Sequence, residues 1–163
     1  MKRTNTKSNR RPAGLQVRPF RLEDYAAVAE LWQTSGLAVD SREQVRRRLK
    51  RDRGLFLVAE VKGKLVGVAM GGWDGRRASL WRLAVSPDFQ RRGVAQALMC
   101  ELESRLQALG AGGAFLLVWH ENRPALKLYR KCGYEPHPGV LFMYKEFPAP
   151  QPAAKKRSQG CDQ

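Results

Sequence analysis

Leu83-Ala84-Val85-Ser86-Pro87-Asp88-Phe89-Gln90-Arg91-Arg92-Gly93-Val94-Ala95 joins an apolar run to a segment with helical periodicity. The run from Leu80 to Val85 is short and apolar enough to predict a buried strand, and Ser86-Pro87-Asp88 interrupts it. Downstream, apolar residues recur at helical spacing, at Val94, Ala97, Leu98, Leu102, Leu106 and Leu109. The sequence therefore predicts a strand, a turn and a helix in immediate succession.

The turn from Gln90 to Ala95 is expected to bind an anion. A strand-to-helix turn directs several free backbone N–H groups towards one point at the positive end of the helix dipole. A diphosphate fits such a site. Gly93 would let the ligand approach closely, because a side chain at this position would obstruct it.

The same turn resembles motif A of the Gcn5-related N-acetyltransferases, the GNAT superfamily, whose signature is Gln/Arg-x-x-Gly-x-Gly/Ala. The motif is Gln90-x-x-Gly93-x-Ala95 in this chain. The resemblance runs from about Val17 to Tyr144 and includes Leu83-Ala84-Val85-Ser86-Pro87, Asn122, Leu128-Tyr129 and Gly133-Tyr134. Among subgroups, segments 55–61 and 70–75 look most like the YpeA-type bacterial acetyltransferases, a resemblance that does not supply the acceptor.

Periodicity and turn residues predict the remaining elements. Strands are expected at 16–20, 55–61, 65–71, 79–85, 114–118 (buried) and 140–144, and helices at 22–33, 40–53, 94–110 and 122–133. Asp40-Ser41-Arg42-Glu43 predicts a capping box for the second helix, and Asn122 an N-cap for the fourth. The order β-α-α-β-β-β-α-β-α-β is α+β. It matches the GNAT acyl-CoA N-acyltransferase fold, a mixed, mostly antiparallel sheet flanked by about four helices, in which the resemblance implies that the fourth and fifth strands splay to admit the cofactor.

The resemblance implies transfer of an acetyl group from acetyl-CoA to an amine by direct attack in a ternary complex. A backbone N–H on the central strand would polarise the thioester carbonyl, and Tyr129 would protonate the departing thiolate. The alternative roles are a plain helix cap for Asn122 and a packed aromatic ring for Tyr129. The cofactor-binding residues that the resemblance implies are Leu83, Ala84, Val85, Arg91, Arg92, Gly93, Val94, Ala95, Gln96, Asn122 and Tyr129.

The general base is harder to identify. The strands at 79–85 and 114–118 contain no carboxylate, so Glu121 is our catalytic candidate, with His120, Glu60 and Asp74 as alternatives. Arg82, within the central strand, either pairs with an acidic acceptor group or points to solvent. A second function therefore stays open: a catalytically idle acyl-CoA-binding or regulatory GNAT module whose basic tails bind nucleic acid or an acidic partner.

Length and charge predict one domain between two basic tails. We expect a disordered tail at 1–14, an acetyltransferase domain at 15–147 and a disordered, Pro/Ala-rich basic tail at 148–163. The formal net charge is +15. No nucleic-acid-binding motif accompanies this charge, so nucleic acid is expected only as a weak, nonspecific contact.

The remaining composition bears on cofactors, location and partners. Cys100, Cys132 and Cys161 have no spacing typical of a disulfide framework or a zinc site, so no metal is expected. No apolar run approaches the roughly 20 residues that cross a bilayer, which predicts a cytoplasmic protein without a membrane partner. The expected partner is an amine acceptor, either a small molecule or a protein N-terminus or lysine; a homodimer is left open.

Overall fold

The computed structural model describes residues 11–147, which form five strands, four α-helices and two short 3₁₀ turns. The N-terminal half contains β1 (Leu15–Pro19), a 3₁₀ turn (Leu22–Asp24), α1 (Tyr25–Thr34), α2 (Arg42–Arg51), β2 (Phe56–Val61) and β3 (Lys64–Trp73). The C-terminal half contains β4 (Ala78–Val85), a 3₁₀ turn (Pro87–Phe89), α3 (Val94–Ala108), β5 (Ala114–Leu116) and α4 (Arg123–Lys131). The α+β class is confirmed.

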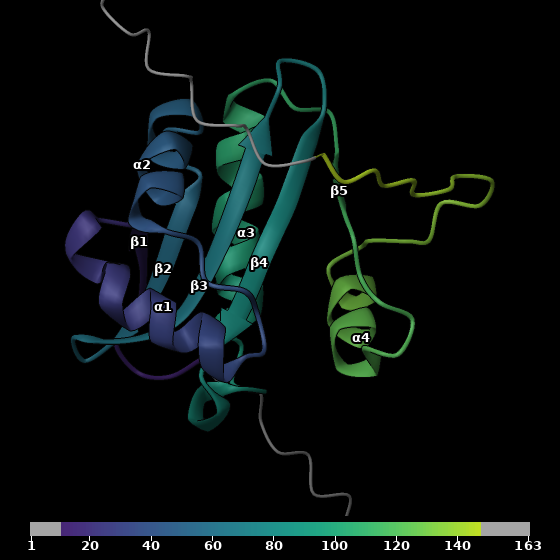
Figure 1. Cartoon of the computed structure of the whole chain (residues 1–163). Coiled ribbons are helices and arrows are strands. Elements are labelled where there is room, and N and C mark those ends of the chain that lie inside the picture. Colours follow the sequence, from purple (N-terminus) through teal and green to yellow (C-terminus); the bar gives the residue numbers. More distant parts are fainter. Residues whose placement is uncertain (1–10, 148–163) are drawn as a thin grey trace, which may run out of the picture.

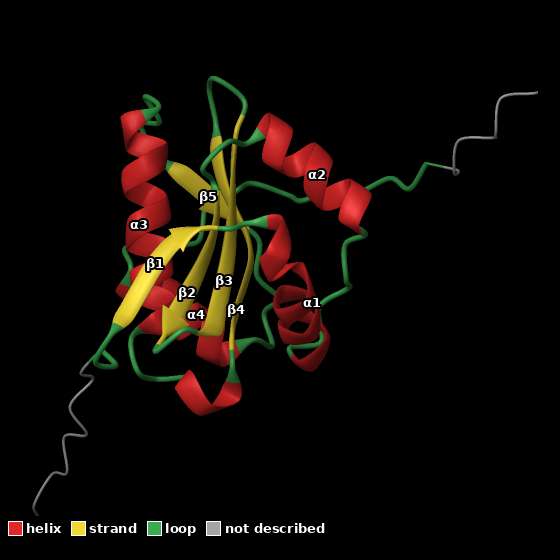
Figure 2. Cartoon of the chain, turned by 90° about the vertical axis from the view of Figure 1, so that its left-hand side faces the viewer, coloured by secondary structure: helices red, strands yellow, loops and turns green. Residues whose placement is uncertain are grey.

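The strands form one mixed sheet in the order β1-β2-β3-β4-β5 (Figure 1). Strands β1 to β4 are antiparallel to their neighbours, whereas β5 is parallel to β4. Helix α3 covers one face of the sheet, and α1 and α2 cover the other (Figure 2). This arrangement makes β4 the last long strand before the β5 edge of the sheet.

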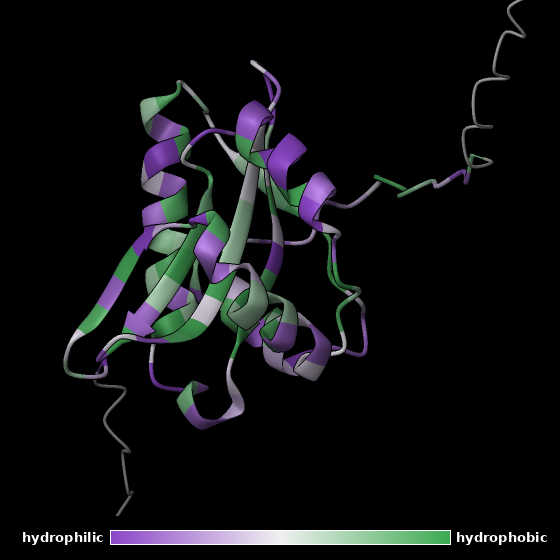
Figure 3. Cartoon of the chain, turned by 60° about the vertical axis from the view of Figure 1, so that its left-hand side comes forward, coloured by the Kyte–Doolittle hydropathy of each residue, from purple (hydrophilic) through white to green (hydrophobic). Residues whose placement is uncertain are grey.

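Strand β2 shows why both faces are covered, because its side chains alternate between two apolar cores. Phe56 and Val58 belong to the core that contains Trp32 of α1. Leu57 and Ala59 belong to the core on the α3 face. A strand buried on both sides needs apolar residues at successive positions. In Figure 3, hydrophilic colour instead dominates α2, whose arginines and lysine are mostly exposed.

Helix α3 lies directly on glycines of β3. A Cβ atom added at Gly67 would lie 2.9 Å from Val94 Cγ1 and 3.0 Å from Leu98 Cδ1. At Gly71 the same atom would lie 2.8 Å from Leu102 Cδ1. The missing side chains therefore set how closely α3, and with it the turn at its N-terminus, approaches the sheet.

The capping box of α2 lies one residue later than the sequence predicts. Ser41 Oγ accepts from Gln44 N at 3.2 Å, and Ser41 N donates to Gln44 Oε1 at 2.7 Å. Asp40 is not the cap because its carboxylate accepts a hydrogen bond from Arg82 instead. The N-cap at Asn122 is confirmed, since its side chain accepts from Ala125 N at 3.2 Å.

Two strand predictions near the C-terminus are wrong. Strand β5 ends at Leu116 rather than 118 and is not fully buried, since Phe115 is 45 % exposed. The strand expected at 140–144 is absent: these residues pair with no strand, and their apolar side chains are exposed. A strand forms only where a neighbouring strand satisfies its backbone, and nothing in the local pattern supplies that partner.

The predicted tails are mostly beyond the described residues. Residues 1–10 and 148–163 lie outside them, as does Cys161, whereas the N–H of Leu15 donates to the carbonyl of Pro12 in a turn before β1. Within residues 11–147, no helix is long and apolar enough to cross a membrane.

Candidate active site

A gap opens between β4 and β5, at the β5 edge of the sheet. The two strands pair only from Ala78–Ala114 to Leu80–Leu116. Beyond Leu80, no described strand lies along this side of β4. The divergence of these strands, expected from the resemblance, is confirmed. It leaves the backbone from Trp81 to Val85 available to an extended ligand.

A bulge distorts β4 at the gap. Opposite β4, Met70 pairs with Trp81 and Val68 with Ala84, so Arg82 and Leu83 together face Ala69. Arg82 adopts φ 53°, in the left-handed region. Such a bulge turns backbone groups out of the regular ladder. The family resemblance implies that a backbone N–H of this part of β4 meets the thioester carbonyl.

Tyr129 lies across this gap from the bulge. A cavity of about 70 Å³ is lined by Tyr129 of α4, Met99 of α3 and six residues of the sheet region, namely Ala69, Leu80, Trp81, Arg82, Leu83 and Leu117. The Trp81 ring meets Phe115 of β5 edge-on at 6.0 Å between centroids. Burial raises the pKa of Tyr129, which keeps the phenol protonated at neutral pH. The structure thus brings Tyr129 and Leu83 to one small space.

The turn before α3 has the backbone shape of an anion site. Arg91 and Gly93 both take left-handed conformations, with φ 58° and 81°. At the start of this helix, Ala97 N donates a hydrogen bond to Gly93 O at 3.0 Å. The N–H groups of Val94, Ala95 and Gln96 therefore precede the helical ladder and can bind a ligand. The residues fit a diphosphate group.

The neighbouring side chains organise this turn. Gln90 Nε2 donates to Val85 O at 3.1 Å, which ties the turn to the end of β4. The Arg92 guanidinium lies 5.6 Å from the centroid of Phe89. Arg11, which sequence reasoning missed, lies beside Gly93: a Cβ at Gly93 would be 3.5 Å from Arg11 Cγ. No local pattern around Arg11 could have shown this, since 82 positions separate the two residues.

The candidate bases lie away from the cavity. Glu121 and His120 are exposed in the turn before α4 and do not line it. Glu60 pairs with Arg18, and the Asp74 carboxylate accepts hydrogen bonds from the backbone of Arg76 and Arg77. Asn122, the cap of α4, is also exposed, so its placement beside the cofactor stays a prediction.

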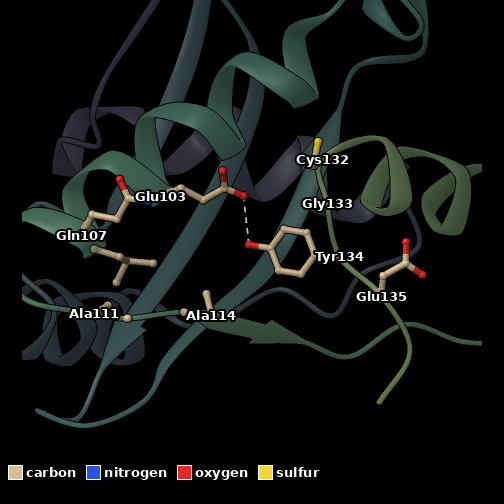
Figure 4. Close-up of a pocket in the computed structure, with 11 residues that line it drawn as sticks. Glu103, Gln107, Ala111, Ala114, Cys132, Gly133, Tyr134 and Glu135 are labelled. Carbon is tan, nitrogen blue, oxygen red and sulfur yellow. Dashed lines mark hydrogen bonds between the residues drawn. The ribbon is translucent and has the colours of Figure 1, made fainter. Parts of the chain in front are cut away.

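A larger cavity, of about 440 Å³, contains none of the predicted site residues. It lies between α3, the start of β5 and the end of α4, and Tyr134 points into it to donate a 2.9 Å hydrogen bond to Glu103 (Figure 4). Burial, followed by this bond to a carboxylate, raises the pKa of Tyr134 strongly. We place the chemistry in the smaller cavity because it adjoins the strand gap.

Comparison with known proteins extends these observations. The chain is 42% identical over 124 residues to "Acetyltransferase ECA0875" of Pectobacterium atrosepticum, covering 74% of this chain and 88% of the relative. It is 39% identical over 134 residues to "Acetyltransferase SG1711" of Sodalis glossinidius, covering 80% and 94%. The YpeA-type assignment is not specifically tested by these matches and stays a prediction.

Solved structures share the fold. Ard1 from Thermoplasma volcanium superposes with a TM-score of 0.69 at 26% identity, covering 74% of this chain and 82% of that chain. The PaiA N-acetyltransferase from Thermoplasma acidophilum, solved in complex with coenzyme A, gives 0.65 at 21% identity, covering 74% and 89%. A family model described as the acetyltransferase (GNAT) family matches residues 24–134, more than half of the chain. The family model and the two relatives above show that the chain belongs to the GNAT acetyltransferases.

Proposed function

We propose that this acetyltransferase moves the acetyl group of acetyl-CoA to an amine by direct attack in a ternary complex. The observation that carries the proposal is the cavity shared by Leu83, at the bulge of β4, and Tyr129 of α4. A backbone donor and a protonated phenol bordering one space would suit acyl transfer, which builds negative charge on oxygen and then on sulfur.

The roles follow from these positions. The turn from Arg91 to Gln96 would bind the diphosphate, and the open edge of β4 would pair with the pantetheine arm. The backbone N–H of Leu83 would polarise the thioester carbonyl. Tyr129 would give its proton to the departing thiolate; burial raises the pKa of the phenol, so the side chain carries this proton at neutral pH.

Removal of the ammonium proton from the acceptor needs a different group. No carboxylate is among the described residues that line the small cavity. Glu121 is our proposed base, and because it is exposed in the turn before α4 it would act through water. Replacement of Glu121 by Gln should then lower turnover at low pH more than at high pH, where the amine is already neutral.

The test measures coenzyme A release with a panel of amines: polyamines, aminoglycosides, amino acids, and peptides with free N-termini or lysines. In parallel, calorimetry measures acetyl-CoA binding to the wild type and to Gly93→Glu, which places bulk and negative charge in the anion turn. Gly75→Glu is the matched control, since Gly75 also has a left-handed φ, of 89°, and open space around it in the β3–β4 turn.

Release with at least one amine, together with loss of binding in Gly93→Glu alone, supports the proposal. Tight acetyl-CoA binding without turnover on any amine would instead indicate the idle acyl-CoA-binding module. Equal affinity of the two glutamate variants would show that the turn before α3 does not hold the diphosphate.

A further inference from the structure

Arg82 connects the β4 bulge to the segment between α1 and α2. Its guanidinium donates hydrogen bonds to the carbonyl of Ala38 and, at 2.6 Å, to Asp40 Oδ1. It also lies over the Trp32 ring, with its carbon 4.9 Å from the centroid. The Arg82 and Asp40 side chains are only 23 % and 26 % exposed, so solvent weakens this pair less than an ordinary surface pair.

The segment is held from a second side as well. The Tyr25 hydroxyl donates to the carbonyl of Asp40 at 2.9 Å. Asp40 is therefore fixed through its backbone by α1 and through its carboxylate by β4. Trp32, on which the guanidinium lies, is fully buried and gives the contact a rigid base.

Arg82 also lines the small cavity that contains Leu83 and Tyr129. Arg82 thus connects the segment 37–41, through Ala38 and Asp40, to the space in which we place acetyl transfer. The left-handed backbone conformation of Arg82 costs free energy in a residue with a side chain. The hydrogen bonds to Ala38 and Asp40 offset part of that cost.

We propose that Arg82 is a positioning residue that fastens residues 37–41 as the acceptor-side wall of the reaction cavity. This inference rests on the proposed function, because it assigns the amine to that side of the gap. Arg82 makes no bond to the reacting atoms in this role. It sets the position of the wall, and therefore the affinity for the acceptor rather than for acetyl-CoA.

The test separates the backbone of residue 82 from its side chain. Arg82→Asn keeps a residue that tolerates the left-handed conformation, so the bulge is retained while the guanidinium is lost. Arg82→Lys retains the charge but not the planar fork that reaches two acceptors. Asp40→Asn removes the partner charge. The control is Arg77→Asn, because the Arg77–Asp74 pair is 3.7 Å long and its side chains are 74 % and 55 % exposed.

Two readouts are combined. Hydrogen exchange of amides 37–41 is measured without substrate, and steady-state kinetics uses the panel amine that gives the fastest coenzyme A release. Arg82→Asn should speed loop exchange and raise the amine KM by about tenfold, the loss expected for a charge-assisted hydrogen bond. The acetyl-CoA Kd should stay within about twofold, Arg82→Lys should recover part of the KM, and Arg77→Asn should change neither readout.

Unchanged exchange of residues 37–41 in Arg82→Asn would overturn the proposal, as would faster exchange with an unchanged amine KM. If Arg77→Asn raised the amine KM as much as Arg82→Asn does, the effect would be one of general charge, and this result would also overturn the proposal. If the wild type acetylates no amine, the proposed function fails and the acceptor role of Arg82 falls with it. Loop exchange, which needs no turnover, then still reports whether Arg82 fastens the segment.

Discussion

Replacing Gly67 by Ala should weaken both the fold and cofactor binding. The added methyl would lie 2.9 Å from Val94 Cγ1, 3.0 Å from Leu98 Cδ1 and 3.4 Å from Ala59 Cβ. Overpacking of this kind costs about 1–3 kcal/mol, and loss of the glycine's freedom in the unfolded chain offsets about 0.4–1 kcal/mol. The free energy of unfolding should therefore fall by up to about 2.6 kcal/mol, or by up to roughly 10 °C in Tm.

The effect on acetyl-CoA binding follows from the contact with Val94, the first residue of α3. A helix pushed away from β3 at this point carries with it the turn in which we place the diphosphate. Thermal unfolding and acetyl-CoA calorimetry measure the two effects. Gly112→Ala is the control, because no atom lies within 4 Å of a Cβ at Gly112 and its φ is not left-handed. This variant should unfold at the wild-type temperature or slightly above it.

A double variant isolates the contact. Val94→Ala removes the closest methyl, so Gly67→Ala should cost less in that background than in the wild type, and the difference is a coupling energy. The reasoning would be refuted by a Gly67→Ala protein that matches Gly112→Ala in Tm and binds acetyl-CoA as tightly.

Three further expectations concern separate parts of the chain. Tyr129→Phe should lower kcat by about 100-fold or more with little change in acetyl-CoA Kd, whereas Tyr134→Phe, at the other cavity, should leave kcat unchanged; equal kcat values for the two would make Tyr129 a packing residue. Asn122→Ala should cost about 0.5–2 kcal/mol in unfolding free energy, because α4 loses its cap, and rescue by Asn122→Ser would identify capping as the cause. The Arg18 guanidinium, through its hydrogen bond, lowers the pKa of Asp24, so the folded state gains stability above the ordinary aspartate range and loses it as pH falls through the lowered pKa. Asp24→Asn should flatten this acid dependence in urea titrations, and an unchanged slope would contradict it.

Local chemistry made the centre of the fold predictable. The strand, turn and helix around Gly93 follow from apolar spacing and glycine. The cap at Asn122 follows from an asparagine placed directly before a helical segment with proline in its first turn. These features depend on neighbours in sequence, so the order of elements up to α4 could be derived before the structure. The roles of Leu83, Asn122 and Tyr129 came from the family resemblance, and the structure adds that Leu83 and Tyr129 share a cavity.

Long-range contacts account for what the sequence could not show. Arg82 meets Asp40 across 42 positions, and this contact removes Asp40 from the capping box that its local sequence suggests. Arg11 reaches Gly93 across the fold without any periodic signal. The segment 140–144 is apolar enough for a strand, but a strand also depends on a partner edge, which no local pattern encodes.

The short pairing of β5 has a mechanical consequence. Three residue pairs, from Ala78–Ala114 to Leu80–Leu116, join β5 to the rest of the sheet. Helix α4, which contains Tyr129, follows β5 in the chain. In the ligand-free protein, local opening is expected between β4 and β5, since few ladder hydrogen bonds must break there. A molecule bound along β4 would connect the part of the chain that contains Tyr129 to the part that contains the turn before α3. At 100 times its Kd, such a ligand adds about 2.7 kcal/mol to the free energy of unfolding.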